Sequence, residues 1–198
     1  MARPHAWPQP RRTSSTPSRR STSARSGRAR AAAPGSALIH YTQLQLDTQP
    51  GVSLHDITPL IVQLSGTGLR EGLATVLSRH TTTAVTINEF EPRLLDDVRQ
   101  FVRKLAPPQD PYLHNDLHLR AAPPDWPGGH AAWAAQEPVN AHSHLLSMVL
   151  GNSQSIPVVE GKLALGTWQS VILVELDGPR TRSVGLQLMG SVGGGSGP

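Results

Sequence analysis

Residues 170–189 read SVILVELDGPRTRSVGLQLM and contain two aliphatic, β-branched runs on either side of the turn sequence DGPR. Runs of this kind are typical of strands, so we expect strands over residues 170–176 and 182–189. An Asp-Gly pair between two apolar runs is a hairpin signal. Asp177 and Gly178 therefore predict that these two strands pair with each other.

Further strand patterns precede this segment in the sequence. Polar and apolar residues alternate between Ala37 and Thr48, as they do in a half-buried strand. Short runs rich in aliphatic or β-branched residues favour further strands, over residues 72–78, 81–87, 155–160 and 162–165.

Helical periodicity is confined to three places. Pro92 opens a helix whose apolar residues recur at 3.6-residue spacing as far as Leu105. A second main helix is expected over about residues 143–150, with Gly151 as its terminating residue. Asp56 is the expected cap of a short helix that ends near Leu64. Strands outnumber helices, so we predict the α+β class: a mostly antiparallel sheet or sheets with two main helices.

The net charge of +4 and the pI of 10.3 suggest a nucleic-acid binder, but the charge is unevenly distributed. Residues 1–35 carry eight Arg and no acidic residue, so the rest of the chain is mildly acidic. There is no cysteine, which excludes disulfides, thiolate metal sites and Cys nucleophiles. No apolar run of about 18 residues is present, so we expect no membrane span.

The composition predicts that the chain consists of three segments. Residues 1–36 are expected to form a disordered basic leader, because a segment with so few large aliphatics buries little apolar surface. An acid-free, Arg- and Ser-rich leader is typical of an organelle transit peptide; an extension without such a role and a nucleic-acid arm are the alternatives. Residues 37–190 are expected to form a single domain, and residues 191–198 a flexible Gly/Ser tail.

Residues 107–139 stand apart because they hold seven prolines and three histidines. Long loops inside a domain are usually functional. His114, Asp116 and His118 would share one face of an extended segment, where they could bind Zn²⁺. An exposed polar strand face is an equally good interpretation of the same spacing.

Other histidines are clustered near the second main helix and before residues 81–87. His142 and His144 lie two residues apart, so a helix cannot direct both at one metal ion. With Met148 one turn later, His144 is expected to point into the interior. No GxSxG, P-loop, HExxH or GxGxxG motif is present, which removes the common hydrolase, nucleotide-binding and protease signatures.

Five sequence blocks together carry a resemblance to a known family. Over about residues 38–190 the chain resembles the YjbQ family, also called the secondary thiamine-phosphate synthase family. The blocks are HTTTAVTINE (80–89), NAHSHL (140–145), LGNS (150–153), GKLALGTWQ (161–169) and ELDGPRTR (175–182). Residues 112–118 and 123–129 are similar to plant and algal members, which implies a plastid location, with mitochondrion or cytoplasm as alternatives.

The resemblance implies a YjbQ-like fold, a homotrimer with sites near subunit boundaries, a bound divalent metal and a weak, secondary thiamine-phosphate synthase activity. The recurring histidines of the family fall on His80, His114 and His144, the implied metal ligands. Asn140 and Glu89 are the implied catalytic groups, with Glu89 as general base or as a partner that orients a histidine. His118 and His142 rank lower.

Thiamine-phosphate synthesis joins a pyrimidine methyl pyrophosphate to a thiazole phosphate and releases pyrophosphate. We expect Arg182 to receive a phosphate group, helped by the hydroxyls of Ser153 and Thr82, because Arg offers a planar fork to phosphate oxygens. A solvated hairpin that carries Arg180 and Arg182 is an equally good interpretation. A histidine-rich site suits Zn²⁺ better than Mg²⁺, which prefers carboxylates. Trp168 is expected to pack in the core, with stacking on a substrate as the alternative.

Other functions stay open at this point. A metal-dependent hydrolase of an unidentified substrate is one alternative, since Zn²⁺ with an open position activates water. A non-catalytic homotrimer that binds a metal or a small ligand is the other. We expect a phosphorylated small molecule as substrate and neither a membrane nor nucleic acid as a partner.

Overall fold

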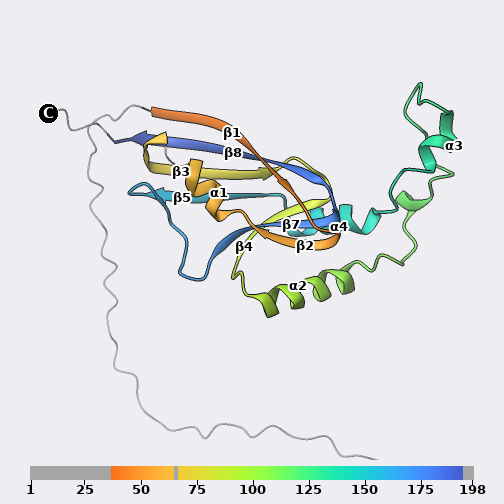
Figure 1. Cartoon of the computed structure of the whole chain (residues 1–198), viewed down its shortest axis with the longest axis horizontal. Coiled ribbons are helices and arrows are strands. Elements are labelled where there is room, and N and C mark those ends of the chain that lie inside the picture. Colours follow the sequence, from red (N-terminus) through yellow and green to blue (C-terminus); the bar gives the residue numbers. More distant parts are fainter. Residues whose placement is uncertain (1–36, 65–66, 194–198) are drawn as a thin grey trace, which may run out of the picture. The chain divides into compact units, whose positions relative to one another are not determined.

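The computed structural model describes residues 37–64 and 67–193, which form two antiparallel β-sheets with helices packed against them (Figure 1). One sheet has five strands in the order β1-β8-β3-β5-β6, with bounds Ala37–Asp47, Thr181–Val192, Leu69–Ser78, Ser153–Val159 and Lys162–Leu163. The other has three strands in the order β2-β7-β4, with bounds Gly51–Asp56, Ser170–Gly178 and Thr83–Asn88. The predicted α+β class with antiparallel pairing is confirmed.

The predicted hairpin between the strands flanking Asp177 and Gly178 is wrong. β7 pairs with β2 and β4, whereas β8 pairs with β1 and β3, so the two strands belong to different sheets. Gly178 is needed for another reason: a Cβ atom there would lie 2.3 Å from the carbonyl oxygen of Gln49. The chain crosses from one sheet to the other at this point while packing closely on the connection between β1 and β2.

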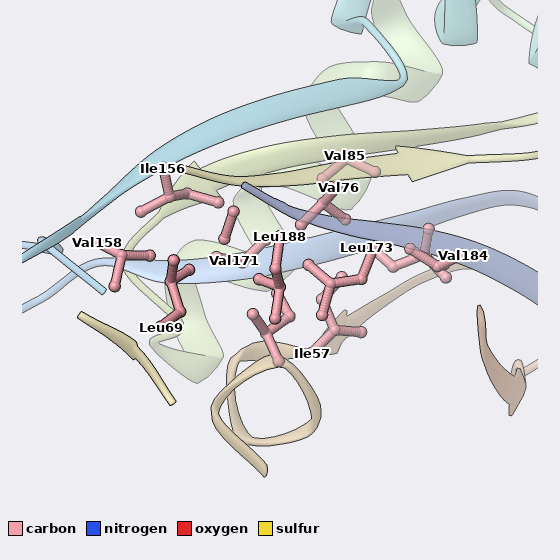
Figure 2. Packing of buried hydrophobic residues seen from close by; sticks show 13 residues of the cluster. Ile57, Leu69, Val76, Val85, Ile156, Val158, Val171, Leu173, Val184 and Leu188 are labelled. Atoms are coloured by element: carbon pink, nitrogen blue, oxygen red, sulfur yellow. The ribbon is translucent and has the colours of Figure 1, made fainter. Parts of the chain in front are cut away.

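The main hydrophobic core lies between the two sheets (Figure 2). Val76 and Val184 come from the five-stranded sheet, and Val85 and Leu173 from the three-stranded sheet; all four are fully buried. Ile57 directly precedes the short helix α1 (Thr58–Leu64), and Ile61 lies within it. Both side chains are fully buried in the same core. The Asp56 carboxylate accepts a hydrogen bond from the Thr58 amide, as the predicted cap requires.

Two main helices are present, as predicted. Helix α2 (Pro92–Leu105) begins with Pro92 and is capped by Glu91, whose carboxylate accepts from the Leu94 amide. Helix α4 (Ala141–Leu150) packs on β4 and β7. Its serines face the sheet, because the hydroxyls of Ser143 and Ser147 donate to the carbonyls of Leu176 and Thr83 at 2.6 Å each.

The proline-rich segment 107–139 is not extended. It contains the 3₁₀ turn η2 (Leu113–Asn115) and the short helix α3 (Gly129–Ala134). The amide of Asp116 donates to the carbonyl of Leu113, and the amide of Leu119 donates to that of Asp116. The single-face argument for His114, Asp116 and His118, which needs an extended backbone, is therefore wrong.

Strands form the first and the last elements of the described domain. β1 starts at Ala37, whereas β8 continues to Val192, two residues beyond the expected end of the domain. The expected leader, residues 1–36, and residues 194–198 of the expected tail lie outside the described residues. No helix within the described part of the chain combines the length and apolar character that crossing a membrane requires.

Candidate functional site

A hollow of about 540 Å³ opens where three connections meet. The β3–β4 connection contributes His80, Thr81 and Thr82, and the start of α4 contributes Asn140 and His144. The β7–β8 crossing adds the rest of the lining, namely Asp177, Arg180, Thr181 and Arg182. The fold thus gathers His80, Thr82, Asn140, His144 and Arg182, five of the predicted site residues, around one space.

A buried ion pair lies beside this hollow. Arg182 is 3% exposed and Glu175 is fully buried. Nε and Nη2 of Arg182 each donate to one carboxylate oxygen of Glu175, both at 2.6 Å. Glu175 also accepts from the Thr48 hydroxyl at 2.8 Å and from the Asp177 amide at 2.8 Å. These four hydrogen bonds compensate the buried charge of the carboxylate.

The same hydrogen bonds control the protonation of Glu175. Burial alone would raise the pKa of this carboxyl, but the bonds from Arg182, the Asp177 amide and Thr48 outweigh burial and lower the pKa below its usual 4.5. Glu175 is therefore ionised at neutral pH.

Arg180 and Arg182, the two arginines of the β7–β8 crossing, differ in which of their N–H groups remain for a ligand. Nη2 of Arg182 also donates to the Thr82 hydroxyl at 2.9 Å, so Nη1 is the amino group that remains for a ligand. The Arg180 side chain is 44% exposed and donates to a carboxylate oxygen of Asp177 at 3.0 Å. The same Asp177 oxygen accepts from the Asn140 amide at 2.7 Å. Asp177 thus holds Arg180 and Asn140 at the edge of the hollow.

His80 is engaged by the backbone. Its Nε2 accepts a hydrogen bond from the Ser183 amide at 2.8 Å, which places the ring proton on Nδ1. Burial, followed by the nearby Arg182 charge, lowers the pKa of His80, so the ring is neutral at pH 7. In this state neither ring nitrogen offers a free lone pair to a metal ion, and the predicted ligand role of His80 would require loss of the Ser183 bond.

His114 and His144 lie against each other. Their ring centroids are 4.9 Å apart, in an edge-to-face arrangement with an interplanar angle of 69°. Burial, followed by the neighbouring His114, lowers the pKa of His144. The expectation that His144 points into the core is wrong: it lines the hollow, and Met148 one turn later is 76% exposed. Within residues 37–64 and 67–193, no three His, Cys, Asp or Glu side chains are placed to hold a metal ion.

Two predicted site residues lie elsewhere. Glu89 follows the far end of β4, and a strand of six residues spans about 20 Å. Glu89 lines separate hollows beside α2 and Trp168. The Ser153 hydroxyl donates to the Val76 carbonyl at 2.9 Å, within the five-stranded sheet, and does not line the hollow.

Sequence reasoning missed Asp177 and Glu175 and did not select Arg180. All three lie in the ELDGPRTR block, from which only Arg182 was chosen. The signal that could have found them is the number of charged residues in this block. Two acids and two arginines lie within eight residues, between two otherwise apolar strands.

Comparison with known proteins gives consistent matches over the described domain. A family model described as UPF0047 protein YjbQ-like matches residues 42–191. A UPF0047 protein of Methanothermobacter thermautotrophicus is 39% identical over 152 residues, which cover 76% of this chain and 92% of that protein. A UPF0047 protein of Archaeoglobus fulgidus is 40% identical over 142 residues, covering 72% and 95%.

A solved structure shares both the fold and part of the sequence. The crystal structure of a YbjQ-like protein of unknown function from Sulfolobus solfataricus matches with a TM-score of 0.66 and 29% identity. The match covers 79% of this chain and 100% of that one.

Removing the carboxylate charge of Glu175 tests the ion pair. Glu175→Gln leaves Arg182 buried without a counter-charge, and we expect a loss of about 3–5 kcal/mol in the free energy of unfolding. Urea unfolding followed by circular dichroism measures it. Asp96→Asn is the matched control, because Asp96 pairs with Arg99 on the surface of α2 and should cost at most about 1 kcal/mol. Equal losses in the two variants would contradict the assignment.

The lowered pKa of Glu175 also predicts a pH dependence with a definite sign. A carboxyl whose pKa is lower in the folded state contributes stability that is complete above its unfolded pKa, usually 4.5, and is lost as the pH falls through the folded pKa. Wild-type stability should therefore fall below about pH 4.5, and its advantage over Glu175→Gln should shrink there. Urea titrations between pH 3 and 7 test this; a constant difference between the two proteins would be inconsistent with it.

Proposed function

The chain belongs to the YjbQ-like UPF0047 family, and from that premise we propose that the hollow binds a phosphorylated small molecule and acts on it. The observation that carries the proposal is the excess of hydrogen-bond donors around this space. Arg180, Nη1 of Arg182 and Nδ1 of His80 are donors. Thr82, whose oxygen accepts from Arg182, keeps its own O–H for a ligand. Phosphate oxygens only accept, so a phosphate ester complements this set.

The chemistry that the family resemblance suggests is thiamine-phosphate synthesis. A carbon–nitrogen bond forms between the thiazole ring nitrogen and the pyrimidine methylene group, the carbon–oxygen bond to pyrophosphate breaks, and pyrophosphate leaves with its charge. Donors preorganised around the departing oxygens favour such a step, because they stabilise charge where it develops. In this proposal Arg180, Arg182 and Thr82 hold the pyrophosphate, and Asn140 acts through Asp177 by keeping Arg180 in place.

We further propose a divalent metal ion, Zn²⁺ in preference to Mg²⁺, at His114 and His144. Imidazole nitrogens suit Zn²⁺, whereas Mg²⁺ prefers oxygen ligands. The two rings supply part of a ligand set, and a structural Zn²⁺ site needs four ligands. The described residues hold no group of three suitable side chains, and in this proposal the remaining ligands come from another copy of the chain or from solvent. No step of the proposed reaction depends on this ion.

A homotrimer with sites at subunit boundaries is the proposed assembly. Its support is an apolar surface beside the two histidines, on α4 and the segment before it. Large exposed apolar patches mark interaction sites, and this one consists of Leu113 (87% exposed), Val139 (58%), Leu145 (41%), Met148 (76%) and Val149 (67%).

Binding of pyrophosphate tests the proposed function. We expect isothermal titration calorimetry to detect pyrophosphate binding by the full chain, and Arg180→Met to weaken it about tenfold through loss of charge-assisted hydrogen bonds. Arg99→Met, on α2, removes the same charge away from the hollow and should change nothing. Wild-type protein should form thiamine phosphate from the two substrates, and Arg180→Met should reduce the rate. Pyrophosphate binding without product would favour a binding protein, and absence of both would overturn the proposal.

Metal content and assembly are predicted to change together. Purified protein should scatter light as a trimer and contain zinc by elemental analysis. His114→Ala and His144→Ala should lose the metal, whereas His118→Ala, at an exposed histidine absent from the hollow, should keep it. Met148→Lys should dissociate the trimer and release zinc as well. A monomeric protein, or zinc retained in both histidine variants, would contradict the shared site.

A further inference from the structure

Two of the most distinctive sequence blocks contain residues that do not line the hollow around His80 and His144, called the histidine-lined hollow below. HTTTAVTINE ends at Glu89, and LGTWQ contains Trp168. The expectation that Trp168 packs in the core is wrong, because this side chain is 74% exposed. Both residues line the same hollow of about 370 Å³ near the start of α2.

A second, smaller cavity lies between α2 and the three-stranded sheet, and Glu89 lines it as well. Its volume is about 170 Å³. Apolar side chains make most of its wall, including Leu95, Val98 and Val102 from α2 and Ile172 and Val174 from β7. An apolar cavity of about 150 Å³ is large enough to take up benzene and stays free of water. This cavity therefore has room for one apolar ring.

The hollow around Trp168 has the composition of a cation site. Trp168 and Phe90 supply exposed aromatic surface, and no Lys or Arg is among the lining residues. Asp56 and Glu91 are already used as helix caps. For the Glu89 carboxylate, by contrast, the described part of the chain provides no hydrogen bond or ion pair. Cations bind over the faces of aromatic rings, and a free carboxylate adds a counter-charge.

We propose that these two spaces form one binding site for an organic cation that carries a single apolar ring. The ring enters the cavity beneath α2, and the cationic group lies at Glu89 beside the face of Trp168. The site is separate from the histidine-lined hollow, and the proposal does not depend on the function assigned there. The ligand class follows from three features that meet at Glu89: an apolar cavity of ring size, exposed aromatic surface and an uncompensated carboxylate.

Three small probes of one shape but different charge test the site. Calorimetric titration of the full chain at pH 7 with benzylammonium, benzyl alcohol and benzoate should give the order benzylammonium, then benzyl alcohol, then benzoate. We expect benzylammonium to bind about tenfold more tightly than benzyl alcohol, and Glu89→Gln to remove this preference. Trp168→Leu should weaken benzylammonium binding.

Amino-acid substitutions test whether the probes bind at this site and not elsewhere on the molecule. Val98→Phe fills the cavity and should abolish binding of all three probes, with circular dichroism as the check that the variant is folded. If that variant unfolds, the charge preference in Glu89→Gln decides. Asp96→Asn on the surface of α2 and His144→Ala in the other hollow should leave binding unchanged. Equal affinity for all three probes, no binding of benzylammonium, or a charge preference that survives Glu89→Gln would overturn the proposal.

Discussion

Two short hydrogen bonds between Arg182 and Glu175 form a buried ion pair that joins the two sheets of this protein. Glu175 belongs to β7 in the three-stranded sheet, and Arg182 belongs to β8 in the five-stranded sheet. A buried charge pair is costly unless further hydrogen bonds compensate it, and Thr48, Thr82 and the Asp177 amide supply such bonds. The pair therefore fixes three connections relative to each other, and two of them, β3–β4 and β7–β8, line the hollow.

This arrangement divides the polar groups of the site into two kinds. Glu175, Asp177 and Asn140 hold other side chains in place, whereas Arg180 and the free amino group of Arg182 face the space that a ligand would occupy. His80 and His144 are neutral at pH 7 because burial lowers the pKa of each. A site of this kind recognises an acceptor-rich group by hydrogen bonds that are already positioned, which is how preorganised sites stabilise developing negative charge.

The sequence was a good guide to local structure and a poor guide to what meets across the molecule. The main helices and the strands other than β2 were predicted because period-2 and period-3.6 patterns are local. The crossing at Gly178 was misinterpreted as a hairpin because the need for glycine arises from Gln49, more than a hundred residues away. His144 was directed inward because Met148 follows one turn later, whereas Ser143 and Ser147 are the side chains of α4 that bond to carbonyls of β7 and β4. Arg182 was identified as a site residue, but its buried partner Glu175 was not, since their contact depends on how the two sheets pack together.

A crystal structure of the protein with pyrophosphate tests the account most directly. The account predicts phosphate oxygens within hydrogen-bond distance of Arg180 and Nη1 of Arg182, with both bonds from Arg182 to Glu175 intact. Pyrophosphate bound at another surface, or an Arg182 side chain that leaves Glu175 to reach the ligand, would contradict the claim that the buried pair positions this site.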